Sequence, residues 1–216
     1  QPSAIFMAAG EGKLFCDDID SLIDEILDTF PAAFDNPNYQ RQKKAIDSSF
    51  NEKYDEALEI VEKIANQNNV ALFEESGVIS FAPVIEGKQL DDAEFASLDD
   101  EQKQFFYDVI SRLENALNEA LIELPRWKRE SSEKLRELKQ KTVEAAIKPL
   151  LKDLEHKYTS HLGIVKYLKE LKAELIDAVL EWLGEESDDN NKEDLDKRAM
   201  LTEYIAPNII VSHKEE

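Results

Sequence analysis

Residues 100–124, DEQKQFFYDVISRLENALNEALIEL, decide how this chain of 216 residues must fold. Apolar side chains recur there three or four positions apart, which is the period of an amphipathic α-helix. The stripe runs on to residue 158 and comprises Phe106, Val109, Ile110, Leu113, Leu117, Leu121, Leu124, Leu135, Leu138, Val143, Ile147, Leu150, Leu151, Leu154 and Tyr158. At about 1.5 Å per residue, such a helix spans several tens of ångströms, more than an ordinary helix. The pattern predicts an arm that pairs with another helix and serves reach and contact rather than catalysis in a pocket.

Pro125 and Pro149 interrupt this stripe. Each removes a backbone N–H donor, and a proline ring inside a helix clashes with the preceding turn. We therefore expect a bend or a complete break at each position, most clearly in the sequence Leu124-Pro125-Arg126-Trp127.

A second long helix is predicted from Asn38 to Gln67. Its apolar positions are again mostly three or four apart, and its opposite face is charged or carries amides. These positions are Tyr39, Ile46, Phe50, Tyr54, Leu58, Val61 and Ile64. We expect this helix to be the partner of the helix that begins near Asp100.

Between the two helices the period changes from helical to alternating. Residues 70–81, VALFEESGVISF, predict a β-hairpin, which Pro83 and Gly87 should end. An isolated hairpin is only marginally stable in water, so this one should rest on helix. Phe73, Phe81 and Val84 are the candidate anchors.

Two further helices are expected. Asp17 and Asp18 are suitable N-caps for a helix whose apolar stripe ends at Phe30, just before Pro31. Gly163 should separate off a last helix over residues 164–183.

Both ends of the chain carry short apolar runs that favour strands: AIFMAA at 4–9 and YIAPNIIV at 204–211. An acidic, amide-rich segment precedes the second run and is typical of a mobile linker. The predicted organisation is a strand and loop at 1–16, a helical arm at 17–184 with a hairpin near 70–85, a flexible linker at 185–199 and a returning strand at 200–216. The predicted fold class is mainly α: a long antiparallel helical or coiled-coil arm with a small β-hairpin and short terminal strands.

Composition limits the classes of partner. The chain is 42% hydrophobic and 34% charged, with a formal net charge of −21. That charge disfavours nucleic acid, whose backbone needs a basic footprint, and anionic membrane surfaces. It favours solubility or basic partners. The sequence contains no run of about 18 apolar residues, so it predicts no membrane span.

The single cysteine, Cys16, cannot form an intrachain disulfide, which suits a reducing cytoplasm. Without a partner base in the sequence it is expected to be a buried or idle thiol. Because the chain begins at Gln1 rather than methionine, we expect it to be an excised fragment of a longer protein.

Two motifs resemble catalytic signatures and fail on inspection. Gly10-Glu11-Gly12-Lys13 is similar to the end of a phosphate-binding loop, but Met7 stands where that loop needs glycine and Leu14 where it needs serine or threonine. A plain turn is the better interpretation. Ser131 and Lys134 form a Ser-x-x-Lys pair without the partner motifs of that chemistry, so a solvated helix face is expected.

Metal-binding patterns are equally incomplete. His156 and His161, near Asp153 and Glu155, do not supply a clear set of three or four convergent zinc ligands, and His213 lies in the tail. The aspartates at 17, 18, 20 and 24 fit a helix N-terminus through the helix dipole. Asp188-Asp189-Asn190-Asn191 lacks the glycine of a calcium loop. We predict no catalytic, cofactor-binding or metal-binding residue in this chain.

Arg126-Trp127-Lys128-Arg129 is the one cluster that is both basic and aromatic. It could contact nucleic acid or an acidic partner. The favoured interpretation is that Trp127 packs at the bend while the cationic side chains extend around it.

The order of segments resembles the helical insertion within the ATPase module of bacterial Lon-like ATP-dependent serine proteases. The resemblance covers essentially the whole chain and rests on short phrases rather than on a catalytic signature. Those phrases are AAGEG at 8–12, DIDSLIDEIL at 18–27, FPAAFDNPNY at 30–39, LPRWKRE at 124–130, IKPLL at 147–151, KY at 157–158, VKYL at 165–168 and YIAPNIIV at 204–211.

The resemblance implies a cytoplasmic, ring-forming parent that binds ATP and magnesium and is joined to a protease domain with a Ser-Lys dyad. It implies that the nucleotide loop lies before Gln1 and the protease after Glu216. The chain itself would be inactive and would assist protein-substrate recruitment, gating or ring architecture, with Phe73 and Phe81 as possible substrate contacts. The alternatives are a structural coiled-coil module that spaces or oligomerises domains, and a stand-alone hydrolase that uses Ser131 or the histidines.

Overall fold

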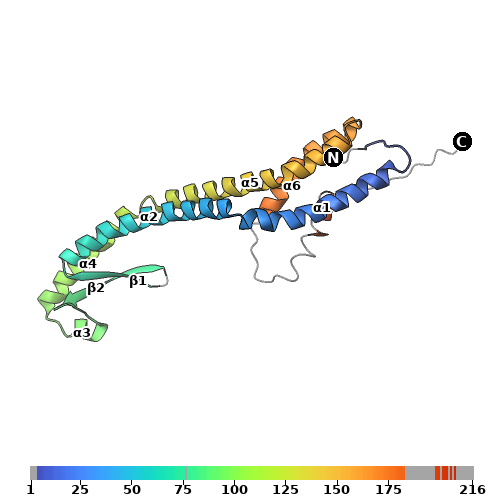
Figure 1. The fold of residues 1–216 in the computed structure, drawn as a ribbon. Coiled ribbons are helices and arrows are strands. Elements are labelled where there is room, and N and C mark those ends of the chain that lie inside the picture. Colours follow the sequence, from blue (N-terminus) through green and yellow to red (C-terminus); the bar gives the residue numbers. More distant parts are fainter. Residues whose placement is uncertain are drawn as a thin grey trace. The chain divides into compact units, whose positions relative to one another are not determined.

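The computed structural model describes residues 4–75, 77–182, 198–199, 201–203, 205 and 207. This part of the chain is mainly helical, with long helices and one small antiparallel sheet (Figure 1). The predicted fold class, mainly α with a small hairpin, is confirmed.

The chain divides into two compact units. The terminal unit consists of Gln1–Lys43 and Leu135–Glu216, and the central unit consists of Lys44–Lys134. Two helices, α2 (Pro37–Gln67) and α5 (Leu124–Lys157), contribute residues to both units. Helix α2 matches the predicted second helix to within one residue at its start.

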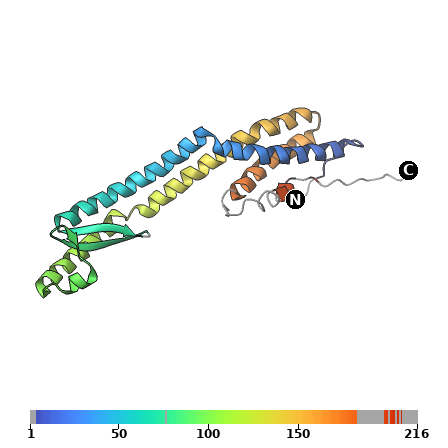
Figure 2. The same ribbon diagram turned by 60° about the horizontal axis from the view of Figure 1, so that its bottom comes forward.

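The terminal unit is built on α1 (Glu11–Asp35), the second part of α5 and α6 (Leu162–Trp182). Helix α1 lies alongside α5 and α6 within this unit (Figure 2). Leu201 and Ile205 join the same core from the end of the chain. Its buried members are Phe15, Ile19, Leu22, Ile23, Ile26, Phe30, Val143, Ile147, Leu151, Tyr158, Ile164, Leu168, Leu171, Leu175, Ile176, Val179, Leu201 and Ile205.

Helix α1 is longer at both ends than its apolar stripe predicted. It begins at Glu11 rather than at Asp17, after Gly10 in the left-handed conformation that needs glycine. Phe15 is buried, which extends the core-facing stripe by one turn. The expected end before Pro31 is wrong, because the helix runs through that proline to Asp35. Pro31 is the fifth residue from the end of the helix, where its missing N–H removes one helical hydrogen bond, and buried Phe30 holds that turn against the core.

The central unit packs the first part of α5 and most of α2 with α3 (Asp92–Ala96), α4 (Asp100–Ala120) and the sheet. Its core is smaller, and its buried members are Val61, Ala65, Val70, Phe106, Val109 and Leu113. Helices α3 and α4 are both capped by aspartates. The side chain of Asp91 accepts a hydrogen bond from the backbone N–H of Glu94, and that of Asp99 accepts one from Gln102.

The sheet contains the predicted hairpin. Strands β1 (Val70–Glu75) and β2 (Val78–Ile85) are antiparallel, with Leu72 opposite Phe81. A two-residue strand, β3 (Lys88–Gln89), pairs with the end of β2. The strand order is β1-β2-β3, so β1 is an edge strand.

The two prolines of the long stripe behave differently. Helix α4 ends at Ala120, residues 121–123 form a turn, and Pro125 is the second residue of α5. In a first helical turn the missing N–H has no helical partner to lose. Pro149 instead lies inside α5, which continues through it to Lys157. The single stripe therefore belongs to two helices.

The expected strand over residues 4–9 is wrong. Residues 4–8 have no regular secondary structure, and Ile5 packs on Gly163 instead, with its Cγ2 atom 3.1 Å from where a Cβ would stand. That glycine lies inside α6 and does not precede it as expected. Ile5 and Met7 of this run pack against the core of the terminal unit, whereas Phe6 is exposed.

The returning strand predicted at 200–216 is also wrong where the structure describes it. Residues 201–203 and Ile205 are helical, and Leu201 and Ile205 are fully buried. The rest of that segment lies outside the described residues. So does the predicted linker at 185–199, except for residues 198 and 199, which are helical.

Candidate protein-interaction surface on the central unit

The outer face of the hairpin carries two exposed apolar side chains. Successive side chains of a strand point to opposite faces, and Val70 and Leu72 pack into the core of the central unit. Phe73 therefore lies on the other face and is 37% exposed, and Val78 is 63% exposed. Exposed apolar side chains next to each other on a sheet are typical of a contact surface.

The two predicted contact residues lie on opposite faces. Phe81 is half-buried and packs against the core of the central unit opposite Leu72. It acts as the predicted anchor of the hairpin. Phe73 lies on the exposed face. Of the two phenylalanines, only Phe73 is therefore exposed enough to contact a partner.

The free edge of β1 exposes backbone hydrogen-bonding groups. The backbone N–H of Val84 donates to the carbonyl oxygen of Asn69 at 2.7 Å. This bond shows which residues of β1 direct their N–H and C=O groups towards β2. Antiparallel pairs alternate between hydrogen-bonded and non-hydrogen-bonded. The N–H and C=O groups of Leu72 and Glu74 therefore point away from β2, and the described sheet has no strand on that side. Those of Val70 point the same way, but Val70 is buried in the core of the central unit.

Beside the base of the hairpin lies an open hollow of about 800 Å³. Apolar and acidic side chains share its wall: Val84, Ile85, Phe105 and Phe106 with Glu86, Asp99 and Glu101, besides Asn69, Gly87 and Gln102. The Phe105 ring is half exposed. Such a wall suits a partner that is both apolar and basic.

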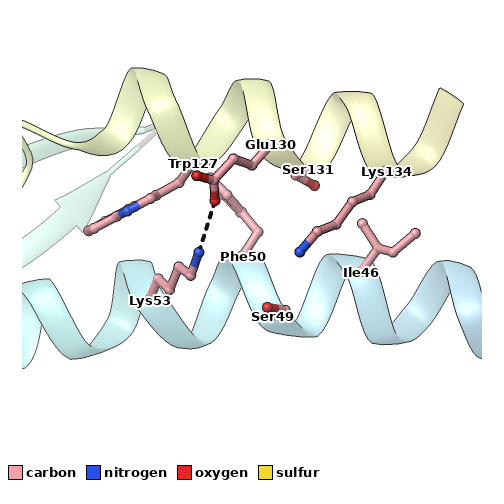
Figure 3. Close-up of a pocket in the computed structure, with 8 residues that line it drawn as sticks. All are labelled: Ile46, Ser49, Phe50, Lys53, Trp127, Glu130, Ser131 and Lys134. Atoms are coloured by element: carbon pink, nitrogen blue, oxygen red, sulfur yellow. Dashed lines mark hydrogen bonds and ion pairs between the residues drawn. The ribbon is translucent and has the colours of Figure 1, made fainter. Parts of the chain in front are cut away.

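A second, very small pocket lies between α2 and α5 of the central unit (Figure 3). Its volume of about 10 Å³ is that of roughly one water molecule. Across it, the Nζ atom of Lys53 lies 3.2 Å from a carboxylate oxygen of Glu130. Hydrogen bonds from Lys53 and from Arg126, together with their charges, hold the pKa of Glu130 below its usual value.

Trp127 lines this pocket and is half-buried, while Arg126, Lys128 and Arg129 are exposed. Arg126 donates hydrogen bonds to Glu123 in the preceding turn and to Glu130 on its own helix, at 3.1 and 3.0 Å. This arrangement agrees with the favoured interpretation of the cluster, in which Trp127 packs and the cationic side chains extend into solvent. The basic cluster is thereby partly neutralised by its neighbours.

Ser131 and Lys134 line the same pocket, one turn apart on α5. Within the described residues neither side chain hydrogen-bonds to the other. A serine nucleophile needs a base within hydrogen-bond reach, and this geometry does not provide one.

The metal-ligand candidates are separated or paired with cations. His161 lies 3.6 Å from Glu11 as a possible ion pair, and the described residues contain no group of three or more potential metal ligands. Asp18 accepts hydrogen bonds from Tyr158 and Lys157, at 2.5 and 2.7 Å. The group Asp188–Asn191 and His213 lie outside the described residues.

Cys16 is partly buried in the terminal unit. Its Sγ atom lies 3.6 Å from the carbonyl oxygen of Pro207. Burial, together with the charges of Asp20 and Asp17, raises the pKa of this thiol, which disfavours the reactive thiolate. Among the described helices, none has the length and apolar character that crossing a bilayer requires.

Sequence reasoning located the hairpin but not its free edge or the hollow beside it. The sequence signal for a third strand was the Glu86-Gly87 pair between β2 and β3; in the structure both residues have positive φ, at 53° and 77°. Two such residues form a type I′ turn, which begins a third strand. The pair is hard to recognise in the sequence, because asparagine or glycine, rather than glutamate, is the usual residue at the first position of such a turn.

Comparison with known proteins gives this chain no relative: no family model, no curated protein and no solved structure matches it.

Proposed function

We propose that this chain is a non-catalytic helical insertion of a Lon-like ATP-dependent serine protease and that it helps to recruit protein substrates. The parent would be a cytoplasmic ring that couples ATP hydrolysis, with magnesium, to proteolysis. The observation that carries the recruitment role is the exposed apolar face of the hairpin, formed by Phe73 and Val78. Unfolded substrates expose apolar segments, and such a face has the complementary chemistry.

The charge of the chain supports a protein partner over a nucleic acid. A net charge of −21 repels phosphate backbones and attracts basic polypeptide segments. Gating and ring architecture are further roles that a helical insertion of this kind would serve.

The family assignment is tested by the coding sequence on either side of residues 1–216. A phosphate-binding loop upstream and a Ser-Lys protease downstream are expected. A flanking sequence that encodes neither would overturn the assignment.

The recruitment role is tested by binding of a reduced, alkylated and therefore permanently unfolded model protein. Phe73→Ser combined with Val78→Ser should weaken binding several-fold, because the apolar contact area is lost. Leu14→Ser is the matched control, since Leu14 is 61% exposed but belongs to the terminal unit. Equal loss in the control, or no loss in the double variant, would contradict a role for the hairpin.

A coiled-coil spacer or oligomerisation module is the second candidate. Ile60 and Ile64 are four residues apart on α2, on one helical face, and are 59% and 40% exposed. Sedimentation of the isolated chain discriminates the two candidates in part. A stable dimer or hexamer that Ile60→Glu dissociates favours the spacer, whereas a monomer weakens it.

A further inference from the structure

We propose that the free edge of β1 binds an extended segment of an unfolded protein by strand addition, and that it prefers segments in which apolar and basic side chains alternate. This inference rests on the proposed function, because it says how the recruited substrate is held. Its observations are the unpaired backbone edge, the exposed Phe73 beside it and the glutamates at its end.

The edge offers backbone groups that only an extended chain can satisfy together. The N–H and C=O groups of Leu72 and Glu74 point outward from the sheet, with those of Val70 at its base. Alternate residues of an added strand would pair with them, as in a regular antiparallel or parallel ladder. A folded protein surface or a helix cannot present that spacing.

The edge carries no proline, lysine or bulge, and its charged side chains, Glu74 and Glu75, repel an acidic strand but not a basic one. Exposed edges are commonly protected by proline, by lysine or by a bulge. The sequence of β1, VALFEE, contains neither residue, and its register with β2 runs without a bulge from Val70 to Glu75. The strand is therefore open to a further strand at its accessible end, where Phe73, Glu74 and Glu75 are exposed.

The side chains beside the edge define the preferred segment. A strand added next to β1 would place every second side chain on the outer face of the sheet, next to Phe73. Neighbouring apolar and aromatic side chains on one sheet face stabilise a strand pair by roughly 0.2–1 kcal/mol each. Apolar residues at alternate positions of the bound segment are therefore favoured.

The charge at the end of β1 favours basic residues at the remaining positions. Glu74 and Glu75 lie on opposite faces of the strand, and both are exposed. Neither has an ion-pair partner among the described residues. Lysine or arginine in the bound segment would gain an opposite charge on either face. A second copy of this chain would instead bring its own glutamates to the edge, and like charges repel.

Glu74→Pro is the sharpest variant for the edge. It deletes the outward N–H of Glu74 and leaves the hydrogen bonds between β1 and β2 intact, because that residue pairs with Ile79 at a non-hydrogen-bonded position. Proline is tolerated on edge strands for this reason. Glu74→Ala is the matched control, since it removes the same carboxylate but keeps the N–H.

The probe is a fluorescently labelled peptide of alternating valine and lysine, and its affinity for the full chain is measured by anisotropy. We expect Glu74→Pro to bind about tenfold more weakly than Glu74→Ala, and Glu74→Ala a few-fold more weakly than the unmodified chain. Amide hydrogen exchange on β2 checks that both variants keep the hairpin. Equal affinity of the proline and alanine variants would overturn strand addition.

A second measurement leaves the chain unchanged and modifies the peptide. N-methylation of alternate residues removes the N–H donors along one edge of the peptide, and methylation of the other set removes those of its opposite edge. We expect one peptide to lose binding about tenfold and the other to lose little. Peptides that lose binding equally, or not at all, would contradict pairing through a single edge.

The outcomes separate this inference from the proposed function. If Phe73→Ser with Val78→Ser weakens substrate binding while Glu74→Pro does not, the recruitment role stands and the strand-addition mode fails. If the peptide binds through the edge but the flanking sequence encodes no ATPase or protease, the binding mode stands and the family assignment fails. A dimer that Glu74→Pro dissociates, without peptide binding, would identify a second copy as the occupant and overturn the inference.

Discussion

The two units bury their apolar residues to different extents. Among the largest fully buried side chains of the described residues, Leu113 alone belongs to the central unit, and the rest belong to the terminal unit. The large exposed apolar side chains show the reverse, since the terminal unit contributes Phe6, Leu14 and Leu162 and the central unit contributes Ile60, Ile64, Phe73, Val78, Phe105, Tyr107 and Ile122.

This difference is typical of a stable scaffold and a contact module. Buried apolar area is the main favourable term in folding, so the terminal unit has the larger source of stability. The central unit keeps apolar side chains at its surface, where a partner can cover them. Regions that bind partners are commonly drawn from the less stable part of a protein.

The largest expected effect is in the core of the terminal unit. Leu168 is fully buried on α6, and Leu168→Ala should destabilise the unit by about 3–4 kcal/mol, through lost apolar burial and the cavity left behind. Hydrogen exchange should show lost protection in α1 and α6 and unchanged protection in β1 and β2. Leu162→Ala, on the same helix at an 83% exposed position, should change little. Equal loss of protection in the hairpin would mean that the two units unfold together.

A smaller loss is expected from the matching substitution in the central unit. Leu113 is 1% exposed on α4, and Leu113→Ala should cost about 2–3 kcal/mol, measured as lost protection of the hairpin amides. The cost is lower because several neighbours of this core are only partly buried and can close on the cavity. Ile122→Ala is the exposed control, and a loss larger than that of Leu168→Ala would reverse the assignment of scaffold and contact module.

A polar contact in the terminal unit should contribute about 1–2 kcal/mol to the free energy of unfolding. Tyr158 donates a hydrogen bond to Asp18 at 2.5 Å, and bonds to charged groups are worth more than neutral ones. Tyr158→Phe should destabilise this unit by that amount in urea unfolding followed by hydrogen exchange. Tyr107→Phe, on the central unit at a 58% exposed position, should have almost no effect.

The same contact predicts a dependence on pH. Burial raises the pKa of the Asp18 carboxyl, but hydrogen bonds from Lys157 and Tyr158 outweigh it and hold the pKa below its usual value. The carboxylate therefore stabilises the folded state above about pH 3.9, the pKa of an unfolded aspartate. This stability is lost as the pH falls through the lower folded-state pKa. The difference between the unmodified chain and Tyr158→Phe should shrink over that range, and a constant difference would contradict it.

The comparison also shows what the sequence could predict. The helical period located α2 and α4, and alternation located the hairpin, because each element buries one face against a core. The strands predicted for residues 4–9 and for the described part of 200–216 were wrong, because a short apolar run without a clear period fits a buried strand and a segment that packs on helices equally well. The free edge of β1 was beyond prediction, since it depends on which strands are missing beside it rather than on its own residues.

The smallest expected effect concerns the turn that ends β2. Glu86 adopts a φ of 53°, a conformation that asparagine tolerates better than glutamate. Glu86→Asn should therefore stabilise the central unit by roughly 0.5–1 kcal/mol and leave the terminal unit unchanged, measured by hydrogen exchange in β2 and α6. Glu86→Gln is the control, because it removes the same charge and keeps the strain. If both variants stabilise the unit equally, charge repulsion with Asp99 and Glu101 around the hollow outweighs backbone strain at this turn.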